Sequence, residues 1–126
     1  MTSPSLALKA TVRVEGIREK HLGPRMDFAR VEFEVEPADG FIVVVQVPGI
    51  EGDAERQMFI DWAIFGFLDV VMVTDGYPVK SMKLTVVAAE FDAIDSSMRA
   101  FRLAGRDAGR ALLEKLRAGT RPLADA

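Results

Sequence analysis

Apolar and polar residues alternate along several short stretches of the chain. An alternation with a period of two is typical of β-strands that bury one face. The stretches that show it predict strands at residues 6–14, 31–35, 41–47 and 79–89. Residues 16–28 lose the alternation and contain Gly23-Pro24, so the sequence predicts a loop between the first two strands.

Two longer stretches have the spacing of helices instead. Asp53 is a candidate N-cap for a first helix that runs to about residue 68. Residues 95–97 (Asp-Ser-Ser) would cap a second helix that ends near Arg117. The apolar residues of this second helix recur at i, i+3, i+4 and i+7, which predicts a single buried stripe.

The first helix is apolar almost all the way round, which predicts burial on more than one side. Its aromatic residues are too many for one face of a small core. The sequence therefore predicts that part of the helix meets a second copy of the chain or another partner. The candidate interface residues are Ile60, Ile64, Phe65 and Phe67.

The elements follow one another as β-β-β-α-β-α, which predicts an α+β fold with a mixed four-stranded sheet and both helices on its apolar face. Gly105 and Gly109 predict a close approach of another backbone to the second helix. Residues 1–118 are expected to form a single domain and residues 119–126 a flexible tail. The other sheet face would carry charges that pair across the strands. These charged residues are Lys9, Arg13, Glu32, Glu34, Glu36 and Lys83.

Composition excludes several classes of site. The 126 residues include no cysteine and one histidine, His21, which excludes disulfides, thiolate metal sites and histidine-rich metal sites. A net charge of −3 does not draw the whole molecule to nucleic acid or to anionic membranes. The start has no signal-peptide pattern and the longest apolar run is far too short to span a bilayer, so we expect a cytoplasmic protein with no membrane partner.

The second half of the chain carries several motifs in a fixed spacing. Residues 76–79 (Gly-Tyr-Pro-Val) open the fourth predicted strand, residues 91–97 (Phe-Asp-Ala-Ile-Asp-Ser-Ser) follow it, and residues 100–104 (Ala-Phe-Arg-Leu-Ala) lie on the second helix. In this order they resemble domain IV of translation elongation factor G, without a gap across residues 76–112. Weaker matches lie upstream, at residues 34–37, 40–41 and 48–50.

The resemblance implies a fold like that of ribosomal protein S5 domain 2. It also implies a free-standing relative of a domain that reaches into the ribosomal decoding site during translocation. The sequence has no Gly-x-x-x-x-Gly-Lys-Ser/Thr loop of the kind that binds nucleotide in such factors. We therefore expect a non-catalytic protein that binds no nucleotide and uses no cofactor.

The two loops that form the working tip in that family are altered here. The first has an Arg-Gly-Gln pattern in the family, and its place is taken by residues 21–27 (His-Leu-Gly-Pro-Arg-Met-Asp). The second has a histidine in the family, at the position of Asp92. A carboxylate repels phosphate where an imidazole would donate a hydrogen bond, so the resemblance supports the fold more strongly than the translocation activity.

Two groups of basic residues are candidates for contact with ribosomal RNA or protein. One gathers in the predicted first loop, which the fold would place near the start of the second helix. The other follows one side of that helix, where it fits RNA phosphate or an acidic protein surface, or else a solvated face compensated by Asp107 and Glu114. Together with Asp92, the candidate residues are Arg18, Lys20, His21, Arg25, Arg99, Arg102, Arg106 and Arg110.

Residues that resemble a catalytic set have simpler explanations. The glutamates of the second strand alternate on one open face, with no pocket to raise a pKa. Ser96 and Ser97 have no histidine nearby in the sequence and stand where a helix needs a cap. A small-molecule kinase, which this fold also hosts, is disfavoured because the glycine-rich phosphate loop is absent. Two hypotheses stay open: a translation-related domain that contacts ribosome or RNA, and a homo-oligomeric structural module that pairs through its first helix.

Overall fold

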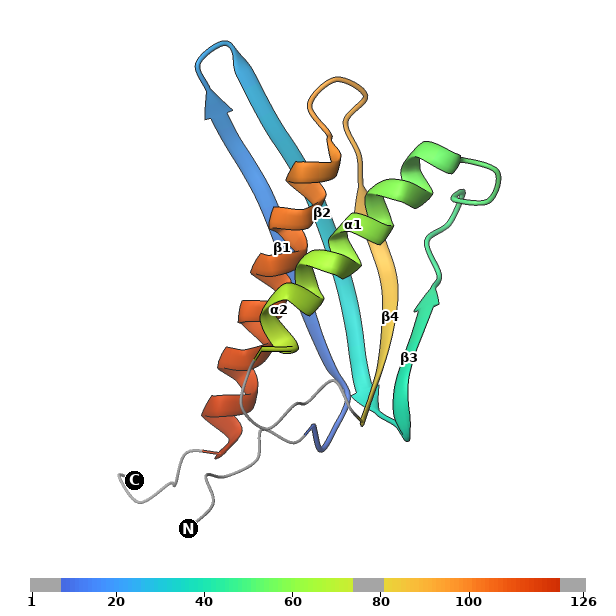
Figure 1. Ribbon diagram of the computed structural model, residues 1–126, viewed down its shortest axis with the longest axis vertical. Helices are drawn as coiled ribbons and strands as arrows, with labels where there is room; N and C mark the ends of the chain where they lie inside the picture. Colours follow the sequence, from blue (N-terminus) through green and yellow to red (C-terminus); the bar gives the residue numbers. More distant parts are fainter. Residues whose placement is uncertain (1–7, 74–80, 121–126) are drawn as a thin grey trace.

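Four strands and two helices alternate in the order that the sequence pattern predicts. The computed structural model describes residues 8–73 and 81–120. In chain order the elements are β1 (Val12–Leu22), β2 (Arg25–Pro37), β3 (Gly40–Val45), α1 (Ala54–Val71), β4 (Ser81–Glu90) and α2 (Met98–Thr120) (Figure 1). The turn at residues 76–79 and the expected strand residues 6–7 and 79–80 lie outside the described part.

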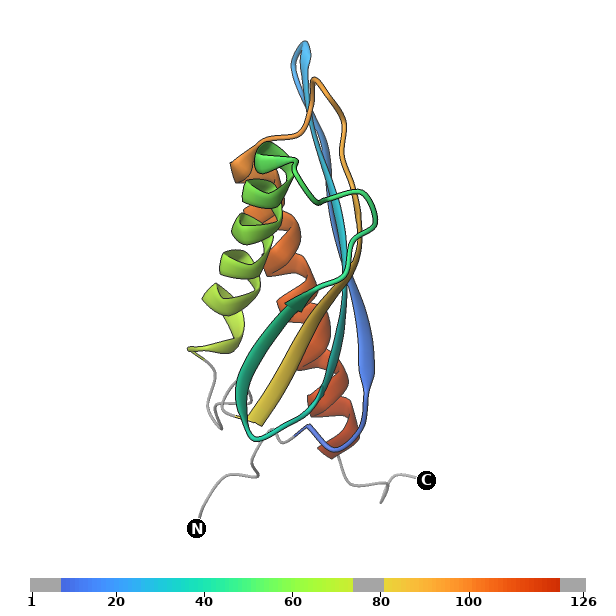
Figure 2. The same cartoon turned by 90° about the vertical axis from the view of Figure 1, so that its right-hand side faces the viewer.

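The strands form one mixed sheet in the order β1-β2-β4-β3. β1 pairs with β2, and β2 with β4, in antiparallel fashion, whereas β3 lies parallel to β4. Parallel neighbours need a crossover connection, and α1 provides it between β3 and β4. Figure 2 shows both helices on the same side of the sheet. The predicted α+β class, element order and one-sided helix layer are confirmed.

The predicted loop at residues 16–28 is wrong, because the first two strands continue through it. β1 and β2 stay paired as far as Leu22 and Arg25, and residues 8–11 precede β1 instead of belonging to it. The outer part of this hairpin extends past the helices (Figure 1). Polar residues lie on both of its faces. Alternation marks a strand only where apolar side chains fill one face, so the sequence pattern gives no signal here.

Gly23 and Pro24 form the two-residue turn of this hairpin. Gly23 has a φ of 65°, which suits the first central position of a type II′ turn. The proline ring then holds the next φ negative. A glycine-first pair between two strands is the sequence signal that could have predicted the hairpin.

Helix α1 begins at the predicted cap and runs further than expected. A carboxylate oxygen of Asp53 accepts the N–H of Arg56 at 3.0 Å. The helix continues to Val71, past the predicted end near residue 68.

Helix α2 is capped by Ser97, whose hydroxyl accepts the N–H of Ala100 at 3.0 Å. The helix runs to Thr120. Residues 119 and 120 of the expected tail are therefore helical, and residues 121–126 lie outside the described part.

Glycines allow the two helices to pack with their backbones almost in contact. A Cβ added at Gly105 of α2 would lie 1.9 Å from the carbonyl oxygen of Ala63, and one at Gly66 of α1 would lie 1.9 Å from that of Arg102. No side chain fits at such distances, so both positions require glycine. The close approach that the sequence predicted at Gly105 is confirmed.

Three of the four interface residues predicted on α1 are in the core instead. Ile60, Ile64 and Phe67 are 1%, 8% and 0% exposed, and Phe67 meets Phe33 of the sheet with ring centroids 5.2 Å apart. They cannot reach a partner. Phe65 alone of the four is exposed, at 47%. Because apolar residues surround the helix, the sequence pattern did not reveal which of them the sheet covers.

The outer face of the sheet carries ion pairs between strands, as predicted. These pairs are partly solvated, so each contributes little to stability. They also compensate the row of glutamates on β2. The pairs are Arg13–Glu34, Arg30–Glu15, Arg30–Glu90 and Lys83–Glu36.

Candidate functional site

Three segments that are distant in sequence meet at one end of the molecule, which we call the hairpin end. It consists of the outer part of the β1–β2 hairpin (residues 18–28), the β4–α2 loop (residues 91–97) and the first turn of α2 (residues 98–101) (Figure 1). Both loops that the family resemblance singled out, residues 21–27 and the segment around Asp92, belong to this end.

Hydrogen bonds fasten the β4–α2 loop to β2. The N–H of Phe28 donates to the carbonyl of Asp95 at 3.0 Å, and the Ser96 hydroxyl donates to the carbonyl of Phe28 at 2.8 Å. The same hydroxyl oxygen accepts the N–H of Asp92 at 2.8 Å. Ser96 is thus a structural residue, and the hairpin and the loop present one continuous surface.

Asp92 folds back onto its own loop. Its Oδ1 accepts the N–H of Asp95 at 2.8 Å and the N–H of Ile94 at 2.9 Å. These bonds, the one from Asp95 first, hold the pKa of the Asp92 carboxyl below its ordinary value. The carboxylate therefore shapes a tight turn and stays charged at neutral pH, while Ile94 at the apex is 90% exposed.

Two of the predicted basic residues share one buried carboxylate. Asp27 is 3% exposed, and its Oδ2 lies 3.4 Å from Nη2 of Arg18 and 3.9 Å from Nη1 of Arg99. A buried carboxylate needs such partners, so this cluster ties β1, β2 and α2 together. The Arg99 side chain is 70% exposed and remains open to a ligand, whereas the Arg18 side chain is only 21% exposed.

The other candidate contact residues of the hairpin lie near its turn, but on different sides. Successive strand residues point to opposite faces. Lys20 shares a face with Asp27, its partner in register, and His21 lies on the other face. Both are exposed, and Arg25 pairs in register with Leu22 next to the turn. The hairpin therefore presents Lys20 and His21 on opposite faces, instead of the single basic loop that the sequence predicted.

The arginine stripe of α2 is divided by an acid on α1. The Asp69 carboxylate accepts hydrogen bonds from Arg102 at 2.7 and 2.9 Å and from Arg106 at 3.0 Å. These bonds, the one from Arg102 first, lower the pKa of Asp69 to about 2. Arg102 and Arg106 therefore join the helices, while the exposed Arg110 makes no ion pair with any residue that the structure describes.

The acid that compensates this stripe was not one of those the sequence suggested. Asp107 instead accepts the N–H of Ile17 in β1 at 3.1 Å. Asp69 was missed because it lies beyond residue 68, where the sequence pattern placed the end of the first helix, whereas α1 continues to Val71.

A hollow of about 460 Å³ at the hairpin end was also missed, because its walls come from separate elements. Phe91 forms part of the wall and stacks on Phe101 with centroids 5.1 Å apart, and the Arg56 guanidinium lies 4.9 Å from the Phe91 centroid. The wall is aromatic and acidic, which does not suit phosphate. Its other lining residues are Met26, Phe28, Ala89, Glu90, Asp92 and Asp95.

Within residues 8–73 and 81–120, which the structure describes, no group of three or more His, Cys, Asp or Glu is arranged to hold a metal ion. Neither described helix is long and apolar enough to cross a membrane.

Comparisons with known proteins agree with the resemblance. The family model for "Elongation factor G, domain IV" matches residues 5–116. Curated proteins named elongation factor G, from Rhodopseudomonas palustris, Carsonella ruddii and Dehalococcoides mccartyi, are 32%, 31% and 29% identical to this chain. The alignments cover 90%, 86% and 86% of this chain but 17%, 16% and 16% of those proteins, so the chain spans about one sixth of their length.

The fold also matches a solved structure. A crystal structure of a protein from Thermus thermophilus superposes with a TM-score of 0.72 at 22% identity, and the match covers 87% of this chain and 16% of that one. At this identity the likeness concerns the fold alone.

Proposed function

This chain belongs to the elongation factor G domain IV family, and we propose that it is a non-catalytic module that binds ribosomal RNA with its hairpin end. Family membership makes it a translation-factor-like domain, and the RNA contact is the proposed part. The proposal assigns that contact to Lys20, Arg25 and Arg99. It assigns Arg102 and Arg106 to the joint between the helices.

The observation that carries the proposal is the projection of the β1–β2 hairpin beyond the helix layer, beside the β4–α2 loop (Figure 2). A narrow two-stranded projection can enter a recess of folded RNA that the body of the domain cannot. Proteins recognise structured RNA largely by such shape matching together with phosphate contacts. The loop supports the hairpin through the Phe28 and Ser96 hydrogen bonds, which keeps the projection in a fixed direction.

The charges of the hairpin end support a weak, salt-sensitive contact. Lys20 and Arg99 are exposed, while Arg18 is held against Asp27. Two or three phosphate contacts would give a slope of about −2 to −3 in a plot of log affinity against log salt. Asp92 and Glu19 add negative charge nearby and hold the affinity down.

Co-sedimentation with ribosomes at rising KCl concentration tests the proposal. We expect wild type to pellet at low salt and to be released as salt rises. The variant Lys20→Glu/Arg25→Glu should lose at least about tenfold in affinity and show a slope shallower by about 2, because each phosphate contact contributes about one unit.

The matched control is Lys9→Glu/Lys83→Glu, which makes the same charge change away from the hairpin end. It should bind within about twofold of wild type. Equal losses in both variants would mean that only net charge matters. If wild type fails to pellet at low salt, or if the hairpin variant binds like wild type, the proposal is wrong.

A further inference from the structure

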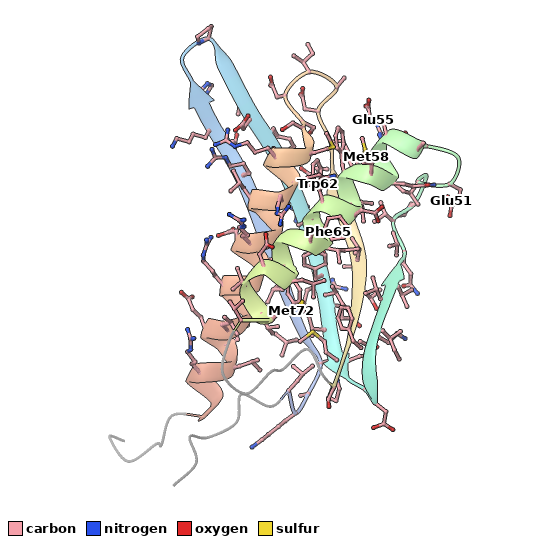
Figure 3. The ribbon with its side chains drawn as sticks, viewed as in Figure 1. Glu51, Glu55, Met58, Trp62, Phe65 and Met72 are labelled. Carbon is pink, nitrogen blue, oxygen red and sulfur yellow. The ribbon has the colours of Figure 1, made fainter. Side chains whose placement is uncertain are left out.

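One side of α1, together with the two residues that follow the helix, points away from the sheet and is mostly apolar. We call it the outer face of α1 and define it by Met58, Trp62, Phe65, Asp69, Met72 and Val73. Met58, Phe65, Met72 and Val73 are 40%, 47%, 52% and 82% exposed. In Figure 3 the labelled members follow the helix on the side that faces the viewer, with the sheet behind them.

The members of this face are spaced as in a helix-pairing seam. Positions 58, 62, 65, 69 and 72 alternate steps of four and three residues, which keeps them in line for contact with a second helix. Asp69 is the polar member, and it is neutralised by Arg102 and Arg106. The seam is therefore apolar or compensated over its whole length.

The aromatic centre of the seam is held in place before any partner arrives. Trp62 and Phe65 meet edge to face with centroids 6.1 Å apart, and the Arg102 guanidinium lies 5.2 Å from the Trp62 centroid. A groove of about 500 Å³ runs beside Phe65 and Met72 and would receive side chains from a facing helix. Preorganised aromatic residues beside a groove favour binding, because little side-chain freedom is lost.

Opposite charges stand at the two ends of the seam. Glu51 and Glu55, both exposed, lie at the N-terminal end (Figure 3). The helices run in the same direction, since Gly105 meets Ala63 whereas Gly109 meets Phe67. The later turns of α2, with Arg106 and Arg110, therefore accompany the C-terminal end of α1.

We propose that two copies of this chain associate by antiparallel packing of their outer α1 faces. A two-fold axis between Trp62 and Phe65 sets the same surface against itself. It places the Glu51 and Glu55 end of each copy against the Arg106 and Arg110 end of the other. A parallel arrangement would set like charges together, so the charge pattern selects the antiparallel one.

A single helix seam buries less than the roughly 1,600 Å² of a standard interface, so we expect a weak dimer with a dissociation constant of about 1–100 μM. This association uses no residue of the hairpin end. Its success or failure is thus independent of RNA binding.

Sedimentation velocity from about 2 to 500 μM tests the proposal. Wild type should shift towards dimer as concentration rises, and Phe65→Glu should stay monomeric over the whole range because it places a charge at the centre of the seam. Ile94→Glu makes the same change at an exposed apolar residue of the hairpin end and should dimerise like wild type. A far-ultraviolet circular dichroism spectrum checks that each variant is folded.

A charge exchange tests the antiparallel orientation. Glu55→Arg should weaken the dimer at least about threefold, and Glu55→Arg/Arg110→Glu should restore it. If wild type remains monomeric at 500 μM, a different protein segment covers this face and the proposal is wrong. A dimer that Phe65→Glu leaves intact, or that Ile94→Glu disrupts equally, contradicts it as well.

Discussion

The hairpin end and the outer face of α1 are both exposed, yet they are built from opposite chemistry. The hairpin end presents cations, carboxylates and backbone turns on a projection beyond the core. The outer face of α1 presents methionine, tryptophan and phenylalanine on a rigid helix that lies against the core. The hairpin end suits a charged, solvated ligand such as RNA phosphate. The outer face of α1 suits an apolar partner surface from which water is excluded.

This difference separates two kinds of positive charge on α2. Arg99 belongs to the hairpin end and its side chain is largely exposed. Arg102 and Arg106 instead form ion pairs with Asp69 at the edge of the outer α1 face. A stripe of arginines in the sequence thus becomes two functional units in space. Counting basic residues along a helix does not reveal this, because their partners come from another element.

The largest effect on stability is expected from a substitution where the two helices touch, since that contact positions both the hairpin end and the outer face of α1. Gly105→Ala would place a Cβ 1.9 Å from the carbonyl oxygen of Ala63, so the helices must move apart. We expect a loss of about 2–3 kcal/mol in the free energy of unfolding, measured by urea denaturation.

Gly109→Ala is the matched control for that measurement. Its Cβ would lie 3.1 Å from the nearest atoms, the Phe67 carbonyl oxygen and Val70 Cβ, and alanine also favours a helix by about 1 kcal/mol. Its stability should stay within about 1 kcal/mol of wild type. Equal losses in the two variants would show that the helices are not in backbone contact at Gly105.

A smaller effect is expected when the acid between the two surfaces is removed. Asp69→Asn should cost about 1 kcal/mol at pH 7, since the ion pairs with Arg102 and Arg106 are partly solvated. It should also free both guanidiniums and raise affinity for RNA at low salt. A variant that binds RNA like wild type would contradict the division of the arginine stripe.

The pH dependence sharpens this test. The pKa of Asp69 is lowered to about 2 from an ordinary value of 3.8, so its stabilisation is present above pH 3.8 and is lost as pH falls towards 2. Wild-type stability should therefore fall more steeply than that of Asp69→Asn between these pH values. Parallel curves would show that the carboxylate is not stabilised in the folded state.

The most local effect is expected at the cap of α2. Ser97→Ala removes the acceptor for the Ala100 N–H and should cost about 1 kcal/mol. The first turn, with Arg99, should then fray and weaken ribosome binding about two- to threefold. Ser81→Ala, at the exposed start of β4, should change stability by less than about 0.5 kcal/mol. A similar loss of stability from both substitutions would contradict the role of Ser97 as the cap of α2.

The sequence predicted those strands and helices that bury one face and expose the other to solvent. The order of elements, the one-sided helix layer and the charged outer sheet face all follow from such contrasts. Beyond Gly16 the covered face of the hairpin carries Arg18 and the buried Asp27 instead of apolar residues, so its strands show no apolar alternation, although the Gly23-Pro24 turn could be read from the sequence. For helix α1 the sequence did not show which residues pack against the sheet, because apolar residues lie on every side of the helix.

The sequence predicted which residues belong to the candidate site, but not how they are arranged in space. The family resemblance placed Asp92 and residues 21–27 in two tip loops, and the structure brings both to one end. The Asp27 cluster, the turn formed by Asp92 and the pairing of Arg102 with Asp69 depend on contacts between elements far apart in the chain. Composition and spacing carry no information about such contacts.

RNA contact at the hairpin end is tested most directly by a titration of the labelled protein with a ribosomal RNA fragment, in which the chemical shifts of the backbone amides are followed. We expect shifts at residues 18–28 and 91–101, weaker at higher salt, while the amides of the outer α1 face stay unchanged. Shifts centred on α1 or on the outer face of the sheet would contradict RNA binding at the hairpin end. The absence of any shift with an RNA fragment that sediments with the protein would contradict it as well.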